Sequence, residues 1–247
     1  MSNSILDAFG QKTYDESKPM AKTFVANVFA YMFAGLAISG IIAWAVGRNV
    51  GTFMSIFYKM GSDGMPAISP VGYIIMFAPL AISLVMQMAY HKLPVWALVG
   101  LFLAYAVLIG LSLSSIFIVF KLGSIISIFF ITAGIYAVMA IIGYTTSVDL
   151  SKFGSILYML FIGIFIASIV NFWLQSSGLD WIISIIGVVV FTGLTAVKLQ
   201  EIRYMSQNVE YGSEPATKLA VIAGLQLYIL FINLFITLLR LFGQRNE

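Results

Sequence analysis

The chain has 247 residues, of which 61% are hydrophobic and 9% are charged, and its mean hydropathy is +1.01. A soluble domain has about a quarter of its residues charged, so this composition excludes a water-soluble fold. The formal net charge of +3 comes from few, scattered ionisable residues, which argues against nucleic-acid binding and suits contact with anionic lipid.

Seven stretches without Asp, Glu, Lys or Arg follow one another along the chain. They cover residues 23–47, 64–91, 93–120, 122–148, 153–179, 181–197 and 219–239. Each can supply the roughly 17 to 25 apolar residues that a membrane-spanning α-helix needs, and the sixth stretch is the tightest fit. Strands are not expected, because an isolated sheet edge leaves backbone groups unsatisfied in hydrocarbon.

The stretches predict an all-α integral membrane protein with seven transmembrane helices. Its predicted parts are a cytoplasmic N-terminal tail at 1–23, a transmembrane domain at 24–242 and a short C-terminal tail at 243–247. Two further hydrophilic segments, a connection at 48–70 and a loop at 198–218, are expected outside the membrane. The lipid bilayer is therefore the first predicted partner.

Lysine and arginine are unevenly divided between the alternate sides of the predicted bundle. The side that holds the N-terminal tail carries eight of them and the other side carries five. Because cytoplasmic loops carry an excess of these residues, the N-terminus is predicted to be cytoplasmic and the C-terminus to lie outside.

Small residues recur at four-residue spacing in several predicted helices, where they would let helix backbones approach closely. The sets are Gly35, Ser39 and Ala43; Gly110 and Ser114; and Gly163 and Ala167. Tight helix packing is the expected role of these residues.

The residue inventory does not favour an enzyme. Cysteine is absent, and the single histidine, His91, lies beside Lys92 at the end of the second stretch, where a structural role is expected. The serines within 110–115 have no histidine at matching depth that could act as a base. No catalytic residue, cofactor site or metal site is therefore predicted.

A few polar residues fall at membrane depth. They are Asn171 in the fifth stretch, Gln226 and Asn233 in the seventh, and Lys198 at the inner end of the sixth. Amides usually join helices by hydrogen bonds, whereas an intramembrane ionisable group is a candidate functional residue. Both interpretations stay open, so these residues are candidates for pore-lining positions.

Several blocks together resemble the Bax inhibitor family, also called the transmembrane Bax inhibitor motif family, and its bacterial branch. The blocks are 32–40, 110–117, 143–146 with 149–150, and 227–235 with 238–243. The most specific is Leu227-Tyr-Ile-Leu-Phe-Ile-Asn-Leu-Phe235, and the resemblance runs from the first helix to the C-terminus.

The resemblance implies a seven-helix fold whose last helix is enclosed by the other six. Members of the family resemble calcium leak channels, eukaryotic members are associated with protection from cell death, and a bacterial relative is tied to regulation of a membrane protease. In calcium-conducting members, two aspartates on the sixth and seventh helices form a proton-sensitive latch near the cytosolic mouth. Two carboxylates that share a proton change their repulsion with pH.

This sequence departs from the family pattern at both latch positions. Lys198, within Val197-Lys-Leu-Gln200, stands where the first aspartate belongs, and Leu230 stands where the second belongs. Glu201 lies one turn from Lys198 and could pair with it, either as a new latch or as a solvated surface contact. The proton-gated mechanism of the family therefore does not carry over.

Two functions follow as expectations. The first is a calcium or cation leak without the usual latch, and the alternative is a non-conducting regulator that binds other membrane proteins, such as a membrane protease. The bacterial character of the resemblance predicts a location in the inner or plasma membrane.

Overall fold

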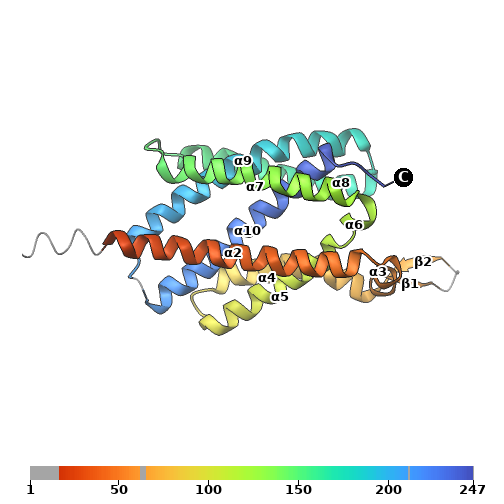
Figure 1. Ribbon diagram of the computed structural model, residues 1–247, viewed down its shortest axis with the longest axis horizontal. Coiled ribbons are helices and arrows are strands. Elements are labelled where there is room, and N and C mark those ends of the chain that lie inside the picture. Colours follow the sequence, from red (N-terminus) through yellow and green to blue (C-terminus); the bar gives the residue numbers. More distant parts are fainter. Residues whose placement is uncertain (1–16, 62–64, 211, 247) are drawn as a thin grey trace, which may run out of the picture.

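The computed structural model describes residues 17–61, 65–210 and 212–246 as a bundle of long helices (Figure 1). The long helices are α2 (Ser17–Gly47), α4 (Pro70–Ala89), α5 (Val95–Leu113), α7 (Leu122–Thr145), α8 (Ser151–Leu174), α9 (Ser177–Asn208) and α10 (Glu214–Phe242). The shorter elements are α3 (Val50–Phe57), β1 (Tyr58–Met60), β2 (Pro66–Ile68) and α6 (Ile116–Val119).

Seven helices of the described part are long and apolar enough to cross a membrane, which confirms the predicted number. The third of these spans covers α5 and α6 together, Val95–Val119. Local sequence explains where several helices begin. The hydroxyls of Ser69, Ser176 and Ser213 accept hydrogen bonds from backbone N–H groups in the first turns of α4, α9 and α10, which satisfies donors that a helix start leaves free.

The predicted hydrophilic loop at 198–218 is wrong for most of its length. Helix α9 continues as far as Asn208 and α10 begins at Glu214, so the sixth stretch, predicted to be the tightest fit, belongs to the longest of the described helices. The charged side chains after Val197 do not end the helix, because several of them find partners within the protein.

The expectation that the chain has no strands is also wrong. Strands β1 and β2 form a short antiparallel hairpin, with Tyr58 opposite Ile68 and Met60 opposite Pro66. The hairpin lies beyond the end of α2 and α3, at one extremity of the bundle (Figure 1). Its strands therefore raise no conflict with the rule that sheet edges avoid hydrocarbon.

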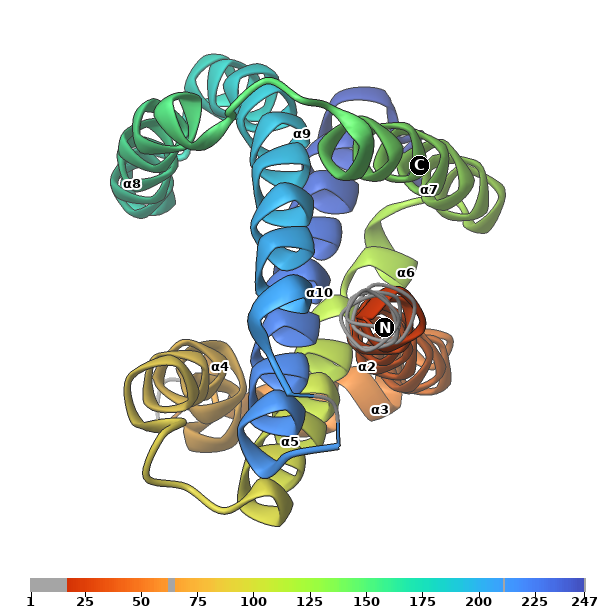
Figure 2. The same ribbon diagram turned by 90° about the vertical axis from the view of Figure 1, so that its left-hand side faces the viewer.

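Helix α10 is the centre of the bundle. Along its length it packs against α2, α4, α5, α7 and α9. Of its most apolar 18-residue segment, 72% is buried inside the protein. Figure 2 shows α10 in the middle of the molecule when the bundle is viewed along its axis. Helix α8 is the most peripheral of the seven spans, because 11% of its most apolar 18-residue segment is buried. It packs chiefly against α9. Five helices therefore enclose the last helix, where six were predicted. The sixth, α8, packs against α9 instead.

Small residues make two of the closest helix crossings. A Cβ added to Gly110 of α5 would stand 2.9 Å from the Cα of Ser39 in α2, and one added to Gly143 of α7 would stand 2.2 Å from the carbonyl oxygen of Ala196 in α9. Gly110 and Ser39 therefore act as predicted. Gly163 does not, because it is exposed on α8 with no neighbour within 4 Å of an added Cβ.

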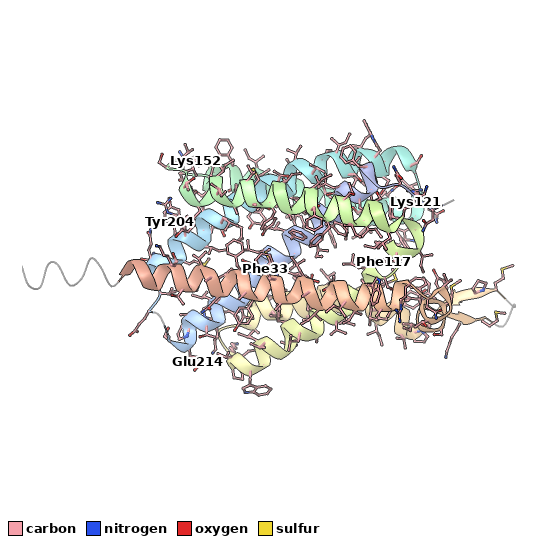
Figure 3. The ribbon with its side chains drawn as sticks, in the orientation of Figure 1. Phe33, Phe117, Lys121, Lys152, Tyr204 and Glu214 are labelled. Atoms are coloured by element: carbon pink, nitrogen blue, oxygen red, sulfur yellow. The ribbon has the colours of Figure 1, made fainter. Side chains whose placement is uncertain are left out.

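The outer surface of the bundle is largely apolar. Large side chains such as Phe33, Trp96 and Trp173 are more than half exposed. Figure 3 shows Phe33 midway along α2, while Lys152 and Glu214 lie towards one end of the bundle and Lys121 towards the other. Apolar flanks with charged ends are what a lipid bilayer accommodates, and the chain is a multi-pass membrane protein.

Candidate functional site

The inner part of α9 is enclosed on all sides. All seven residues from Leu194 to Gln200 are buried, including the charged Lys198 and the amide of Gln200. Ala196 lies against α7 at Gly143, and Val197 lies against α8 at Gly154. A helix buried around its whole circumference places its polar side chains inside the protein, and this stretch is the candidate site.

Lys198 is buried and ion-paired. Its residue surface is 7% exposed, and its amine donates a hydrogen bond to the Oε2 atom of Glu201, one turn further along α9. The same amine lies 6.0 Å from the centre of the Tyr158 ring of α8. The predicted pairing with Glu201 is confirmed, and its lysine end is buried, although the side chain of Glu201 is 35% exposed.

Gln200 and Arg203 hold the connection between α7 and α8. The N–H of Leu150 donates to Oε1 of Gln200 at 2.8 Å, and Nε2 of Gln200 donates to the carbonyl of Val148 at 2.7 Å. Arg203 donates from Nη1 to the carbonyl of Thr146 at 3.3 Å. The α9 residues that follow the latch position therefore fix the loop beside it.

Asp149 orders the other side of that loop. Its carboxylate accepts hydrogen bonds from the hydroxyl of Ser151, at 2.5 Å, and from the backbone N–H of Ser151, at 3.0 Å. These two bonds, in that order, and the charge of Lys152 lower the pKa of Asp149 from its usual value. The carboxylate is fully exposed, so it marks the water-facing edge of the site.

Leu230 is a buried member of the apolar core on α10. Two contacts give the antiparallel register of the helices: Arg240 pairs with Asp180 at 3.1 Å, and the methyl of Thr237 would stand 2.8 Å from a Cβ on Gly187. Eleven residues further along each helix from the second contact, Lys198 of α9 and Gln226 of α10 lie at the same depth. Leu230 is then about one helical turn deeper than Lys198.

The remaining predicted polar residues do not gather around Lys198. Gln226 approaches Gln87 of α4 at 3.5 Å, and the amide of Asn233 donates to the carbonyl of Ile229 in its own helix at 2.8 Å. Asn171 lies thirteen residues beyond Tyr158 on α8, roughly 20 Å along the helix. Its Oδ1 accepts from the N–H of Ser176 at 3.0 Å, so Asn171 caps the far end of α8.

A second polar cluster in the core was not anticipated from the sequence. The hydroxyls of Ser39 and Tyr228 are 2.5 Å apart, and Ser39 Oγ also lies 2.8 Å from the carbonyl oxygens of Gly35 and Ala106. The ring of Tyr105 packs edge-on against that of Tyr228. The cluster joins α2, α5 and α10. It holds the central helix in place, since buried hydroxyls need such partners.

Sequence reasoning also missed Gln200, Arg203 and Tyr158. Gln200 ends the stretch Val197-Lys-Leu-Gln200, which departs from the family pattern, but its contacts come from a loop fifty residues earlier in the chain. Nothing in a single sequence indicates that pairing.

The arrangement at this site is a buried cation, neutralised by a half-buried carboxylate, beside a loop clamped by an amide and a guanidinium.

Comparison with known proteins agrees with this architecture. The family model described as inhibitor of apoptosis-promoting Bax1 matches residues 21–247. The inner membrane protein YbhL of Escherichia coli strain K12 is 40% identical over 226 residues, which are 91% of this chain and 93% of that protein. An uncharacterized protein of Borreliella burgdorferi is 43% identical over 224 residues, 91% of this chain and 93% of its own length. An uncharacterized protein of Rickettsia prowazekii is 37% identical over 239 residues, 96% and 94% of the two chains.

Proposed function

This chain belongs to the Bax inhibitor-1 family, and we propose that it is a cation leak of the inner membrane in which the Lys198–Glu201 pair replaces a proton-sensitive latch. The observation that carries the proposal is the buried Lys198 of α9, which forms an ion pair with Glu201 of the same helix. The family resemblance implies an aspartate at the position of Lys198. The flux we expect is weak for calcium and indifferent to pH in the neutral range.

Electrostatics supports weak passage of calcium. At an effective dielectric near 20, two unit charges about 4 Å apart interact by about 4 kcal/mol, and the interaction with a divalent ion is larger. The amine of Lys198 repels a cation where a carboxylate would attract one. Its pairing with Glu201 reduces that repulsion without inverting it, so monovalent cations are expected to pass more readily than calcium.

A buried hydroxyl deeper on α9 supports access of water to this part of the helix. The Oγ1 atom of Thr192 is buried and has no hydrogen-bond partner among the described residues. It lies six residues before Lys198, about 9 Å along the helix. Buried polar atoms are nearly always satisfied, so an unsatisfied one marks a place that water or an ion would occupy.

Flux from liposomes tests the proposal. Purified protein is reconstituted, and the entry of potassium and of calcium is followed with fluorescent indicators at steps from about pH 6 to about pH 8, the range in which a shared proton on paired carboxylates would titrate. The expected result is a potassium flux above that of empty liposomes, a smaller calcium flux and no step with pH. A strong calcium flux switched by protons would refute the loss of the gate.

A cytoplasmic N-terminus in the inner membrane is part of the proposal. Its support is the excess of lysine and arginine on the N-terminal side and the similarity to YbhL, which is an inner membrane protein. Accessibility of Lys152 and of Lys59 to a membrane-impermeant amine reagent in spheroplasts tests it. Labelling of Lys59, without labelling of Lys152, is expected.

The second candidate is a non-conducting regulator that binds another membrane protein, such as a membrane protease. The observation that favours it is the packing of α10, where the largest fully buried side chains include Tyr228, Leu225 and Leu234. A filled core opposes conduction. Liposomes without flux of either ion, together with recovery of one membrane protein by crosslinking from exposed α8 positions, would favour this candidate over the leak.

A further inference from the structure

An apolar groove opens on the flank of the bundle between α2 and α7. Its volume is about 400 Å³, within the range of small-molecule sites. Its floor is made by Phe231, Ile232 and Phe235 of α10, and Leu113 of α5 with Ile116 and Phe117 of α6 also line it. Apart from the hydroxyl of Ser39, the side chains that line it are apolar.

The two walls of the groove are helical stripes of matching length. On α2 the stripe runs from Leu36 to Trp44, and on α7 it runs from Leu122 to Phe130. Each covers eight residue steps, about 12 Å along the axis. One leaflet of the hydrocarbon core is about 15 Å deep, so the groove extends over most of one leaflet.

The rims of the groove face the surrounding lipid. Trp44, Leu122 and Ile126 are each about half exposed, and Phe130 is 67% exposed. A molecule already dissolved in the bilayer could therefore enter sideways without crossing a polar surface. An elongated hydrocarbon chain fits both the shape of the groove and its lining.

Positive charge lies at the interfacial end of the groove. The guanidinium of Arg48 lies over the ring of Trp44, 4.7 Å from its centre, and Lys121 directly precedes Leu122 (Figure 3). Neither cation forms an ion pair with a described residue. At this end of the described chain the acidic side chain is Asp180, which is already bound to Arg240.

We propose that the groove binds one acyl chain of an anionic glycerophospholipid, with its phosphate between Arg48 and Lys121. The apolar stripe matches the chain in length and chemistry, and the two cations, which have no ion-pair partner in the described part of the protein, complement the headgroup. The start of α7 adds to the attraction, because the N-terminal end of a helix carries partial positive charge. The site belongs to the leaflet opposite the N-terminus of α2 and is independent of whether the protein conducts ions.

Native mass spectrometry of the detergent-solubilised protein tests the proposal, with phosphatidylglycerol and phosphatidylcholine as probes. Retention of one phosphatidylglycerol per chain, about fivefold tighter than phosphatidylcholine for each cation engaged, is expected. Arg48→Gln and Lys121→Gln are expected to remove that preference. Lys59→Gln, at the same end of the bundle but away from the groove, is the charge control. Equal retention of the two lipids by the natural protein would overturn the proposal.

A matched pair of glycines tests the groove itself. Gly40 lines the groove and Gly100 faces outward on α5, and neither has a neighbour within 4 Å of an added Cβ. Gly40→Phe is expected to weaken phosphatidylglycerol binding about tenfold, since it displaces about two methylenes from the groove. Gly100→Phe is expected to leave binding unchanged. Equal binding by the two variants would overturn the assignment.

A fluorescence measurement needs no substitution inside the groove. Phosphatidylglycerol with brominated chains is expected to quench the natural protein more strongly than Trp44→Phe, because Trp44 lines the groove. Trp96→Phe, at the opposite end of the bundle, is expected to retain the saturable quenching. Saturable quenching that survives in Trp44→Phe and is lost in Trp96→Phe would place the lipid elsewhere and overturn the proposal.

Discussion

Lys198 and Glu201 form an ion pair in which the two partners are unequally shielded, since the lysine side chain is 9% exposed and the glutamate side chain 35%. The lysine depends on its partner for solvation, whereas the glutamate retains access to water. Removal of one partner is therefore not equivalent to removal of the other.

Glu201→Gln is expected to destabilise the protein more than Lys198→Met. The first change leaves a buried ammonium without its counter-charge, at a cost of about 1–3 kcal/mol, while the second removes the buried charge and stays within about 1 kcal/mol of the natural protein. The midpoint of thermal unfolding in detergent measures both. The double variant serves as the control and is expected to recover the stability of Lys198→Met. The reverse order of the single variants would contradict the assigned burial.

Lys198→Asp combined with Leu230→Asp is expected to confer pH-dependent flux. Two carboxylates close together on adjacent helices share a proton, which raises one pKa towards neutrality. Calcium flux in liposomes is then expected to change by up to about tenfold per pH unit across the neutral range, because the ratio of the protonated to the deprotonated pair changes about tenfold per pH unit. The double variant with asparagine at both positions supplies polarity without titration and is expected to show no step. An unchanged flux in the aspartate variant would count against the assigned latch positions.

Gln200→Ala is expected to loosen the connection between α7 and α8. The change removes the buried partner of the Leu150 N–H and of the Val148 carbonyl, at a cost of about 1–3 kcal/mol. Limited trypsin digestion is expected to cleave faster after Lys152, which follows this loop. Gln207→Ala, at an exposed position near the end of the same helix, is the control. Equal cleavage rates for the two variants would show that Gln200 does not fix the loop.

Gly143→Ala is expected to separate α7 from α9. The new methyl would stand 2.2 Å from the carbonyl oxygen of Ala196, so the helices must move apart, at a cost of about 1–3 kcal/mol. Gly134→Ala on the same helix meets no neighbour and is expected to be neutral or to stabilise by up to about 1 kcal/mol through helix propensity. Thermal unfolding of the two variants compares them directly. A Gly143→Ala protein as stable as Gly134→Ala would exclude the close crossing.

The sequence predicts the helices well because hydrocarbon leaves the backbone few alternatives. A long apolar stretch without charge must satisfy its own hydrogen bonds, so the number and order of the spans follow from composition. The predicted end of the sixth span, at residue 197, was wrong because charged residues can continue a helix when they find partners. Lys198 and Arg203 read as a loop, but their charges are satisfied by Glu201 and by the carbonyl of Thr146, which lies far away in the chain.

The hairpin and the hydrogen bonds of Gln200 to the α7–α8 connection differ in how well the sequence predicts them. Asp63-Gly64 is a dipeptide that favours a chain reversal, so a turn between β1 and β2 was open to prediction from local sequence. The contacts of Gln200 were not, because they depend on how α7, α8 and α9 pack together. The pairing of Lys198 with Glu201 was foreseen from helical spacing, but its burial was not, since burial depends on neighbours that periodicity does not identify.

The last described residues have a practical consequence for anyone who attaches a reporter or purification tag. The backbone N–H of Lys121 donates to the carbonyl of Gln244 at 2.9 Å, and that of Asn246 donates to the carbonyl of Val119 at 2.9 Å. The Asn246 amide also donates to the carbonyl of Ile118 at 2.9 Å. Residues 244–246 are therefore hydrogen-bonded to the junction between α6 and α7. A protein fused there without a long spacer would disturb these bonds and the start of α7. Deletion of the final four residues would leave the amide of Lys121 without its acceptor.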